Sequence, residues 1–131
     1  MTHASLANAE LAIMDLLWNE GRLTARQMRE RLYPDETKAQ HGTVQRLLQR
    51  LEQKGFVDRD RGLSVHVFFA AVSRQAYASD QLETLTDKLT GGSLAPLITH
   101  LIERRKISQD EIERLRAILD AETEGEEGGG S

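Results

Sequence analysis

Residues 43–69 read TVQRLLQRLEQKGFVDRDRGLSVHVFF, and this stretch decides the fold that we expect for the chain. Its first half carries four apolar side chains at the spacing of one helix face. They are Val44, Leu47, Leu48 and Leu51. Lys54 and Gly55 follow, and a glycine just beyond the last apolar position is typical of the end of a helix. The sequence therefore predicts a helix that closes at this glycine.

The second half of the stretch has the period of a β-strand. Residues 56–59 and 65–69 are rich in β-branched and aromatic side chains, and residues 60–63 between them contain a glycine. Val65, Val67 and Phe69 alternate as a strand with one buried face would. We therefore expect a β-hairpin here.

Two more helices are predicted upstream. Residues 8–19 carry apolar side chains at helical spacing, and Gly21 stands where a left-handed turn would end the helix. Thr24 and Gln27 have the spacing of a capping box, so a second helix should start there and run to about Leu32. Three helices followed by a hairpin is the order of a winged helix-turn-helix unit, which we place at residues 1–72.

The rest of the chain is predicted to be helical. The expected helices cover residues 73–89, residues 94–106 and a segment that starts at a second capping box, Ser108 with Glu111, and fades near Glu122. We assign residues 73–122 to a helical dimerisation domain and residues 123–131 to a flexible tail. The fold class is thus mostly α with a small β-hairpin: a winged helix-turn-helix head and a C-terminal helical dimerisation arm.

Composition excludes several classes of protein. Apolar residues make up 39% and charged residues 29% of the 131, as in a globular chain. The sequence has no cysteine, which excludes disulfides, a thiolate nucleophile and cysteine-ligated metals. No run approaches the roughly 18 apolar residues of a membrane span, and the N-terminus does not look like a signal peptide. We expect a cytoplasmic protein.

The net charge of −4 is unevenly distributed. Residues 22–62 carry ten basic and six acidic side chains, whereas residues 73–131 carry seven basic and twelve acidic ones. The basic excess therefore coincides with the second and third helices and the hairpin. Such a local excess makes nucleic acid a candidate partner despite the acidic total.

The outer face of the third helix has the chemistry of DNA recognition. Arginine and glutamine match the edges of guanine and adenine in the major groove, and threonine can contact a phosphate or a thymine methyl group. Arginines of the second helix and of the hairpin tip could reach phosphates. The candidate DNA-binding residues are Thr24, Arg26, His41, Thr43, Gln45, Arg46, Gln49, Arg50, Arg59 and Arg61. Two simpler interpretations stay open: any solvated helix can carry such a face, and Asp58 and Asp60 could make the wing a neutral turn.

Catalytic and metal sites find little support in the sequence. The four histidines are far apart and do not form a zinc-binding helix motif, and no phosphate-binding glycine motif is present. The acidic residues near Glu111 fit capping and a solvated face. We expect no enzyme activity, no metal and no cofactor.

Several separate motifs resemble one family. They are AELAIMDLLW at 9–18, GRLT at 21–24, TVQRLLQRLEQKG at 43–55, VSRQAY at 72–77, GGS at 91–93 and ISQDEIERLR at 107–116. Over residues 6–120 the chain resembles the penicillinase-repressor family, the BlaI/MecI/CopY group of transcriptional regulators. The resemblance implies a winged-helix head that binds operator DNA, an intertwined homodimer formed by the C-terminal helices, and repression that ends when a protease cuts the arm.

The apolar stripes of the arm are the candidate dimerisation residues. They are Leu94, Leu97, Ile98, Leu101, Ile102, Leu115, Ile118 and Leu119.

The chain departs from the family in two places. The copper-responsive branch has a C-terminal cysteine cluster, which is missing here. The penicillinase branch is cut between Asn and Phe, and His100 and Leu101 occupy the corresponding positions of the candidate protease-sensitive bond.

These features predict a homodimeric repressor that binds palindromic operator DNA through the third helix and the wing. The expected partners are double-stranded operator DNA, a second copy of the chain and, for proteolytic relief, a membrane-bound sensor peptidase; no direct membrane binding is expected. Two alternatives are a winged-helix adaptor that binds protein instead of DNA, and a repressor that responds to a small molecule.

Overall fold

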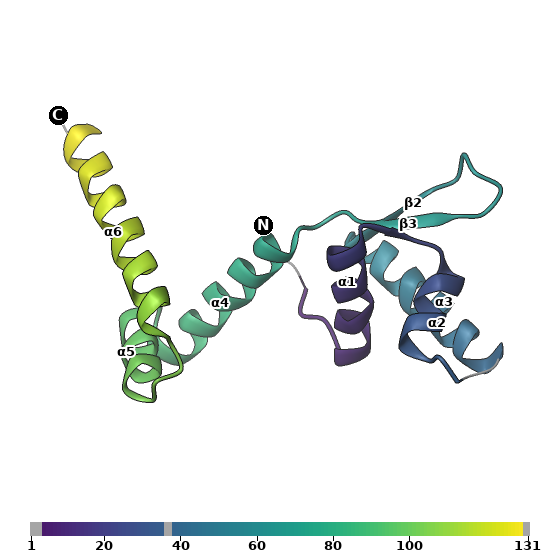
Figure 1. Ribbon diagram of the computed structural model, residues 1–131, viewed down its shortest axis with the longest axis horizontal. Coiled ribbons are helices and arrows are strands. Elements are labelled where there is room, and N and C mark those ends of the chain that lie inside the picture. The colour runs from purple at the N-terminus through teal and green to yellow at the C-terminus, as the bar shows by residue number, and fades with distance from the viewer. Residues whose placement is uncertain (1–3, 36–37, 130–131) are drawn as a thin grey trace. The chain divides into compact units, whose positions relative to one another are not determined.

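The computed structural model describes residues 4–35 and 38–129, with the backbone alone described at residues 38–40 and 124–129. It divides into two compact units, Met1–Thr84 and Leu85–Ser131. The protein is mostly helical with one small antiparallel sheet (Figure 1). Among the described residues, no helix has both the length and the apolar character that crossing a membrane requires.

The first unit is a winged helix-turn-helix head, as the sequence predicts. Its helices are α1 (Asn8–Glu20), α2 (Ala25–Leu32) and α3 (Lys38–Gln53), and its strands are β1 (Arg22–Leu23), β2 (Val57–Asp60) and β3 (Val67–Ala70). The strand order is β1-β3-β2, and both pairs are antiparallel. The hairpin β2–β3 projects from the helices as the wing (Figure 1).

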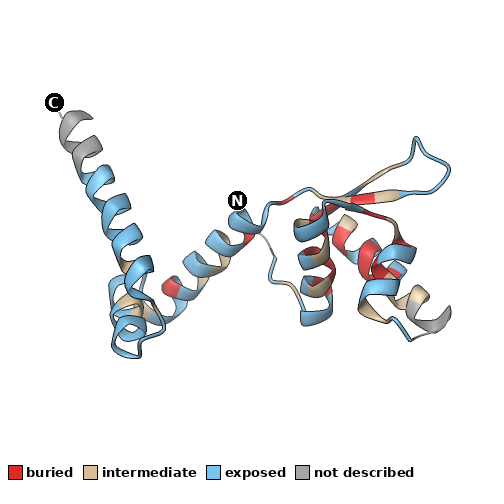
Figure 2. Ribbon diagram, viewed as in Figure 1, coloured by how far each residue is buried: buried red, intermediate tan, exposed pale blue. Residues whose placement is uncertain are grey.

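The core of the head is formed by apolar side chains on the facing sides of the three helices, with the sheet closing one side (Figure 2). The whole predicted stripe of α3 is buried. The largest fully buried side chains are Phe56, Ile13, Met14, Leu17, Met28, Leu48, Leu51 and Val44. Because its inner face is fixed in this way, α3 must present its remaining side chains outward.

The predicted ends of α1 and α2 are confirmed. Gly21 has φ 90°, a left-handed value that favours glycine, and its N–H donates to the Leu17 carbonyl. At the start of α2, the Gln27 N–H donates to the Thr24 hydroxyl at 3.1 Å, and the Thr24 N–H donates to Gln27 Oε1 at 2.9 Å. This reciprocal pair is the expected capping box.

The expected burial of β3 is wrong in its register. The strand begins at Val67, so Val65 lies in the turn and is 56% exposed. Phe68, which lies opposite Leu23 and Arg59, is the buried residue, and Phe69 is half-buried. The short strand β1, which pairs with β3, was missed.

The remaining helices are α4 (Arg74–Thr90), α5 (Ala95–Glu103) and α6 (Gln109–Gly129). The helix α5 ends three residues before the expected Lys106, because Arg105 has φ 56° and the Lys106 N–H turns back to the Leu101 carbonyl. The helix α6 runs past the expected end near Glu122. Glycine weakens a helix by only about 1 kcal/mol per residue and does not forbid it. The domain boundary at residue 72 and the flexible tail stay predictions.

Candidate nucleic-acid interface

The exposed face of α3 is built from glutamine and arginine. Gln45, Arg46, Gln49 and Arg50 are all exposed, while the intervening apolar residues are buried. The four side chains therefore lie on the side of α3 that faces away from the core, as the sequence predicts. Each carries hydrogen-bond donors that can reach a groove of DNA without disturbing the packing of the head.

Two contacts order the side chains at the beginning of this face. The imidazole Nε2 of His41 lies 3.0 Å from the Gln45 side-chain nitrogen, and Arg46 donates to the Thr43 hydroxyl at 3.4 Å. His41 and Thr43 are half-buried. Their position favours a role in orienting Gln45 and Arg46 as well as the contact role that the sequence predicts.

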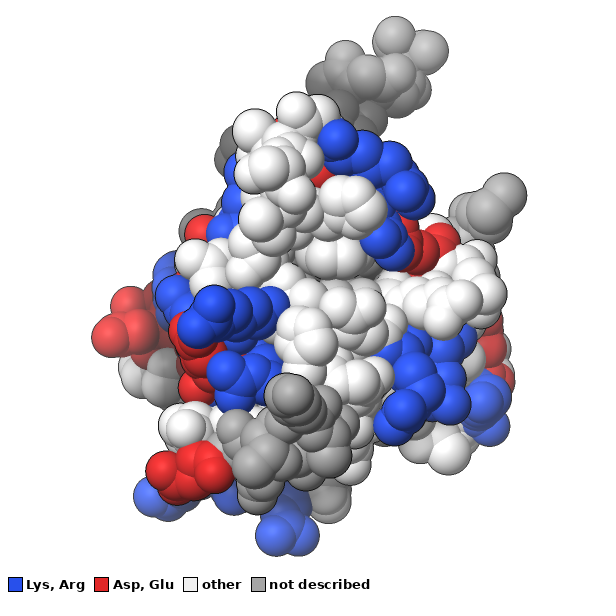
Figure 3. Space-filling model, turned by 90° about the vertical axis from the view of Figure 1, so that its right-hand side faces the viewer, with Lys and Arg blue, Asp and Glu red and all other residues white. Residues whose placement is uncertain are grey.

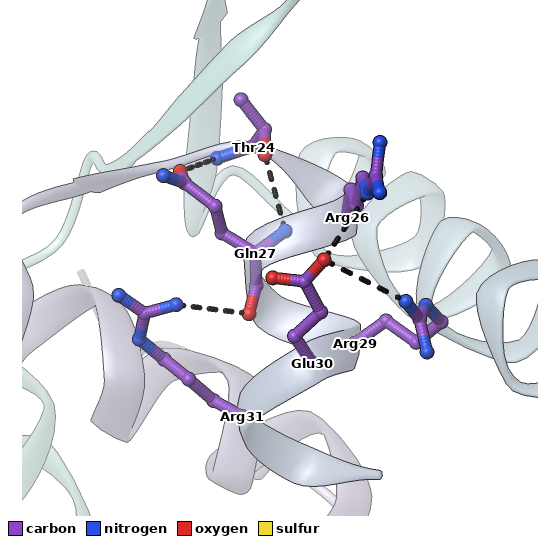
Figure 4. Close-up of polar contacts among 6 residues, drawn as sticks. All are labelled: Thr24, Arg26, Gln27, Arg29, Glu30 and Arg31. Carbon is purple, nitrogen blue, oxygen red and sulfur yellow. Dashed lines mark hydrogen bonds and ion pairs between the residues drawn. The ribbon is translucent and has the colours of Figure 1, made fainter. Parts of the chain in front are cut away.

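The helix α2 adds three arginines (Figure 4), and the Arg26 side chain is more exposed than those of Arg29 and Arg31. The Arg26 side chain is 78% exposed although its Nε donates to Glu30 at 3.1 Å. Arg29 also approaches Glu30, and Arg31 pairs with Glu20 at 2.7 Å. Arg26 is thus the α2 guanidinium most available to a phosphate, whereas the Thr24 side chain is engaged in the capping box.

The two predicted wing arginines differ in their surroundings. Arg59 forms a bidentate ion pair with Glu52 of α3, and its guanidinium lies over the Phe68 ring, 4.8 Å from the centroid. This hydrogen-bonded pair lowers the pKa of the Glu52 carboxyl, against the effect of burial, and raises the pKa of Arg59. Arg59 therefore ties the wing to α3. Arg61 is exposed at the turn.

On the end of the head that carries the wing, lysine and arginine side chains cover more of the surface than acidic side chains do (Figure 3). Lysine and arginine side chains form several clusters around an uncharged centre, and acidic side chains lie mainly toward the sides of this face. An alternation of basic clusters and neutral surface suits a polyanion whose backbones flank a groove.

The sequence analysis did not predict the ion pair that joins β1 to the wing. Arg22 of β1 donates to Asp60 of the wing at 3.1 Å and lies 5.0 Å from the centroid of the Phe69 ring. The opposite charges of Arg22 and Asp60 were visible in the sequence, but the pairing of β1 with β3 that brings them together was not.

The ion pair between Glu10 and Lys54 was also not predicted. The Lys54 ammonium lies 2.9 Å from both oxygens of the buried Glu10 carboxylate, and the Ala7 N–H donates to Oε1 at 3.0 Å. Burial alone raises the pKa of Glu10, but these hydrogen bonds and nearby positive charge outweigh it, so the pKa lies below its ordinary value. The pair fastens the start of α1 to the end of α3.

The second unit carries an exposed apolar groove of about 370 Å³. Its apolar lining comes from α6, α5 and the residue before α5, and consists of Leu94, Ile98, Ile102, Ile112, Leu115, Ile118 and Leu119. Ile112 was not among the predicted dimerisation residues, and Leu97 and Leu101 are not part of the lining. His100 and Leu101, the candidate protease-sensitive pair, are exposed on α5.

Among the residues that the structure describes, no three His, Asp or Glu side chains lie close enough together to hold a metal ion.

Comparison with known proteins gives consistent matches. A family model described as penicillinase repressor matches residues 6–121. The methicillin resistance regulatory protein MecI of Staphylococcus aureus (strain N315) is 26% identical over 114 residues, which cover 87% of this chain and 92% of MecI. The penicillinase repressor of Bacillus licheniformis is 23% identical over 115 residues, which cover 88% of this chain and 89% of that protein.

Two solved structures also match the chain. The oxidised form of MarR from E. coli matches with 19% identity and a TM-score of 0.46, over 89% of this chain and 75% of MarR. A mutant of ZitR from Lactococcus lactis matches with 19% identity and a TM-score of 0.45, over 93% of this chain and 76% of ZitR.

Proposed function

The chain belongs to the penicillinase repressor family, and from this membership we propose that it is a homodimeric transcriptional repressor that binds palindromic operator DNA in the cytoplasm. The observation that carries the proposal is the outer face of α3, where Gln45, Arg46, Gln49 and Arg50 stand exposed on a helix whose other side is locked into the core.

In this proposal α3 enters the major groove. Arginine can donate two hydrogen bonds to guanine and glutamine can pair with adenine, so the four side chains select base pairs. Arg26 of α2 and Arg61 at the wing contact the phosphate backbone or an adjacent minor groove, which fixes the register of α3 without reading sequence. His41 and Thr43 position the first turns of the reading face.

Dimerisation through the arm brings a second head to the operator. Large apolar side chains of this groove, among them Ile102, Ile118 and Leu119, are exposed in the single chain, and a second copy of the same groove is the proposed cover. Linking two heads raises affinity by about 10²–10⁴ through effective concentration alone. Separating the heads would therefore release the operator.

Proteolysis is the proposed route of release. The exposed pair His100 and Leu101 lies in α5, within the arm. A cut there would divide the arm while leaving every proposed DNA contact in place. A membrane-bound sensor peptidase is the proposed source of the cut, and a small molecule that acts on the arm is the alternative.

Footprinting tests the proposal. Full-length protein should protect two half-sites whose centres lie one helical turn, about 10–10.5 base pairs, or a multiple of that apart, and binding should weaken steeply as salt rises. Protection of no sequence at any salt concentration would contradict DNA binding and favour a protein-binding adaptor.

Mass spectrometry of the intact protein, taken while repression is being relieved, distinguishes the two routes of release. A full-length mass that does not change excludes proteolysis.

A further inference from the structure

Contacts outside the proposed DNA-binding surface fasten the first turn of α4 to α1. Trp18 donates from Nε1 to the Val72 carbonyl at 2.8 Å. The Arg74 guanidinium lies over the Trp18 ring, 5.4 Å from its centroid. The same guanidinium donates to Asp15 Oδ1 at 2.6 Å and to Asn19 Oδ1 at 2.9 Å. One arginine thus joins three side chains of α1 to the start of α4.

Tyr77 adds a buried contact one turn further along α4. Its hydroxyl accepts a hydrogen bond from the Leu6 N–H at 2.9 Å. Its ring meets Phe56 edge to face at 5.6 Å between centroids and lies 6.1 Å from the Trp18 ring. Because Phe56 lies just after the end of α3, Tyr77 links α4 to the end of α3 as well as to α1. We call Trp18, Arg74 and Tyr77 the α4 brace.

The α4 brace makes the start of α4 part of the head. All of its contacts lie within the first unit, residues 1–84. From Arg74 to Thr90 the helix contains neither glycine nor proline, the residues at which helices most often bend sharply. The start of α4 is therefore held to the head by packed side chains.

We propose that the α4 brace determines which half-site spacing the repressor accepts, with Arg74 and Trp18 as positioning residues that do not touch DNA. This inference rests on the proposed function. One turn of DNA contains about 10–10.5 base pairs, so each inserted base pair rotates one half-site by about 35° relative to the other. A dimer with stiff joints cannot follow that rotation, whereas one with a loosened joint can.

The experiment uses full-length protein and duplexes that it selects from a random-sequence DNA library. Affinity is measured for the selected full site, for a single half-site, and for full sites with one or two base pairs inserted between the halves. Wild type should lose at least about tenfold in affinity per inserted base pair. Arg74→Ala should lose about threefold or less per insertion and keep its single-half-site affinity within about twofold.

Two further variants separate positioning from general damage. Gln75→Ala changes an exposed neighbour on the same turn of α4 and should keep the wild-type spacing profile. Trp18→Phe keeps an aromatic ring but lacks the N–H that binds Val72, so its spacing penalty should fall between those of wild type and Arg74→Ala.

Equal spacing penalties in wild type and both brace variants would overturn the inference, as would a wild-type protein that tolerates insertions. A parallel loss at the single half-site would also overturn it, because Arg74 would then support the head itself. A library that yields no enriched duplex would contradict the proposed function and remove the premise of this inference. Enrichment followed by equal penalties would refute the inference alone.

Discussion

Replacing Lys54 with alanine removes the cationic partner of the Glu10 carboxylate. Glu10 is only 3% exposed, so its carboxylate is buried. After the change, the Ala7 N–H at 3.0 Å would be the remaining hydrogen bond described for this carboxylate. Breaking a fully buried ion pair costs about 3–5 kcal/mol, and a hydrogen bond to a charged group contributes about 1.5–3 kcal/mol. Because the Lys54 side chain is 35% exposed, water replaces part of the contact. We expect the free energy of unfolding to fall by about 1–3 kcal/mol.

Urea denaturation followed by the fluorescence of Trp18, the single tryptophan of the chain, measures this loss. Lys54→Arg keeps the positive charge and should recover most of the stability, and Gln53→Ala is a matched control at the exposed neighbouring position. A Lys54→Ala loss below about 0.5 kcal/mol, equal to that of the control, would refute the reasoning.

The pH dependence supplies a second check. The folded-state pKa of Glu10 lies below its ordinary value of 4.5, so the folded state binds fewer protons than the unfolded state in this range. The stabilisation is therefore fully present above about pH 4.5 and is lost as pH falls through the folded-state pKa. The difference between wild type and Lys54→Ala should shrink on acidification. A difference that stays constant down to the acid unfolding transition would show that the ion pair is not its source.

Three further predictions concern the proposed function. Arg46→Ala and Arg50→Ala should each cost about 1–3 kcal/mol of operator affinity at the base pair they read, measured by titration of single-base operator variants; unchanged affinity in both would remove α3 from the interface. Arg26→Ala should weaken binding to all sequences alike and reduce the slope of log affinity against log salt by about one, whereas a sequence-dependent loss would indicate base contact. Leu119→Asp should give monomers in sedimentation at micromolar concentration while the head stays folded, because Leu119 is 64% exposed in the single chain and an unpaired charge is costly only when an interface buries it. Glu113→Ala is the control, and a Leu119→Asp protein that still forms dimers would place the interface elsewhere.

The parts of the head that sequence predicted well are those with local physical signals. The stripe Val44, Leu47, Leu48 and Leu51 specifies a buried helix face through its spacing, and the Thr24 capping box is written into residues three apart. Both signals require only neighbouring residues. Which side chains of α3 are buried and which are exposed follows from them directly.

The parts that sequence missed depend on distant pairing. Two residues are too few to show alternation, so β1 left no local pattern, and the buried position of Phe68 could not be told from that of its neighbours. Arg59 looked like Arg61 in the sequence, but Glu52, the residue before the last of α3, forms its ion pair with Arg59. The groove-lining role of Ile112 likewise depends on how α5 and α6 pack.

The separation of the two faces of α3 has a consequence for how such a protein can diverge. Stability resides in the buried face, whereas Gln45, Arg46, Gln49 and Arg50 contribute little to the core. Exposed positions of this kind usually change stability by no more than about 0.5 kcal/mol when substituted. Selection can therefore change the DNA sequence preference of such a protein one residue at a time, because each change leaves the stability of the fold nearly unaltered. After gene duplication, two copies could acquire different targets while sharing one unchanged scaffold.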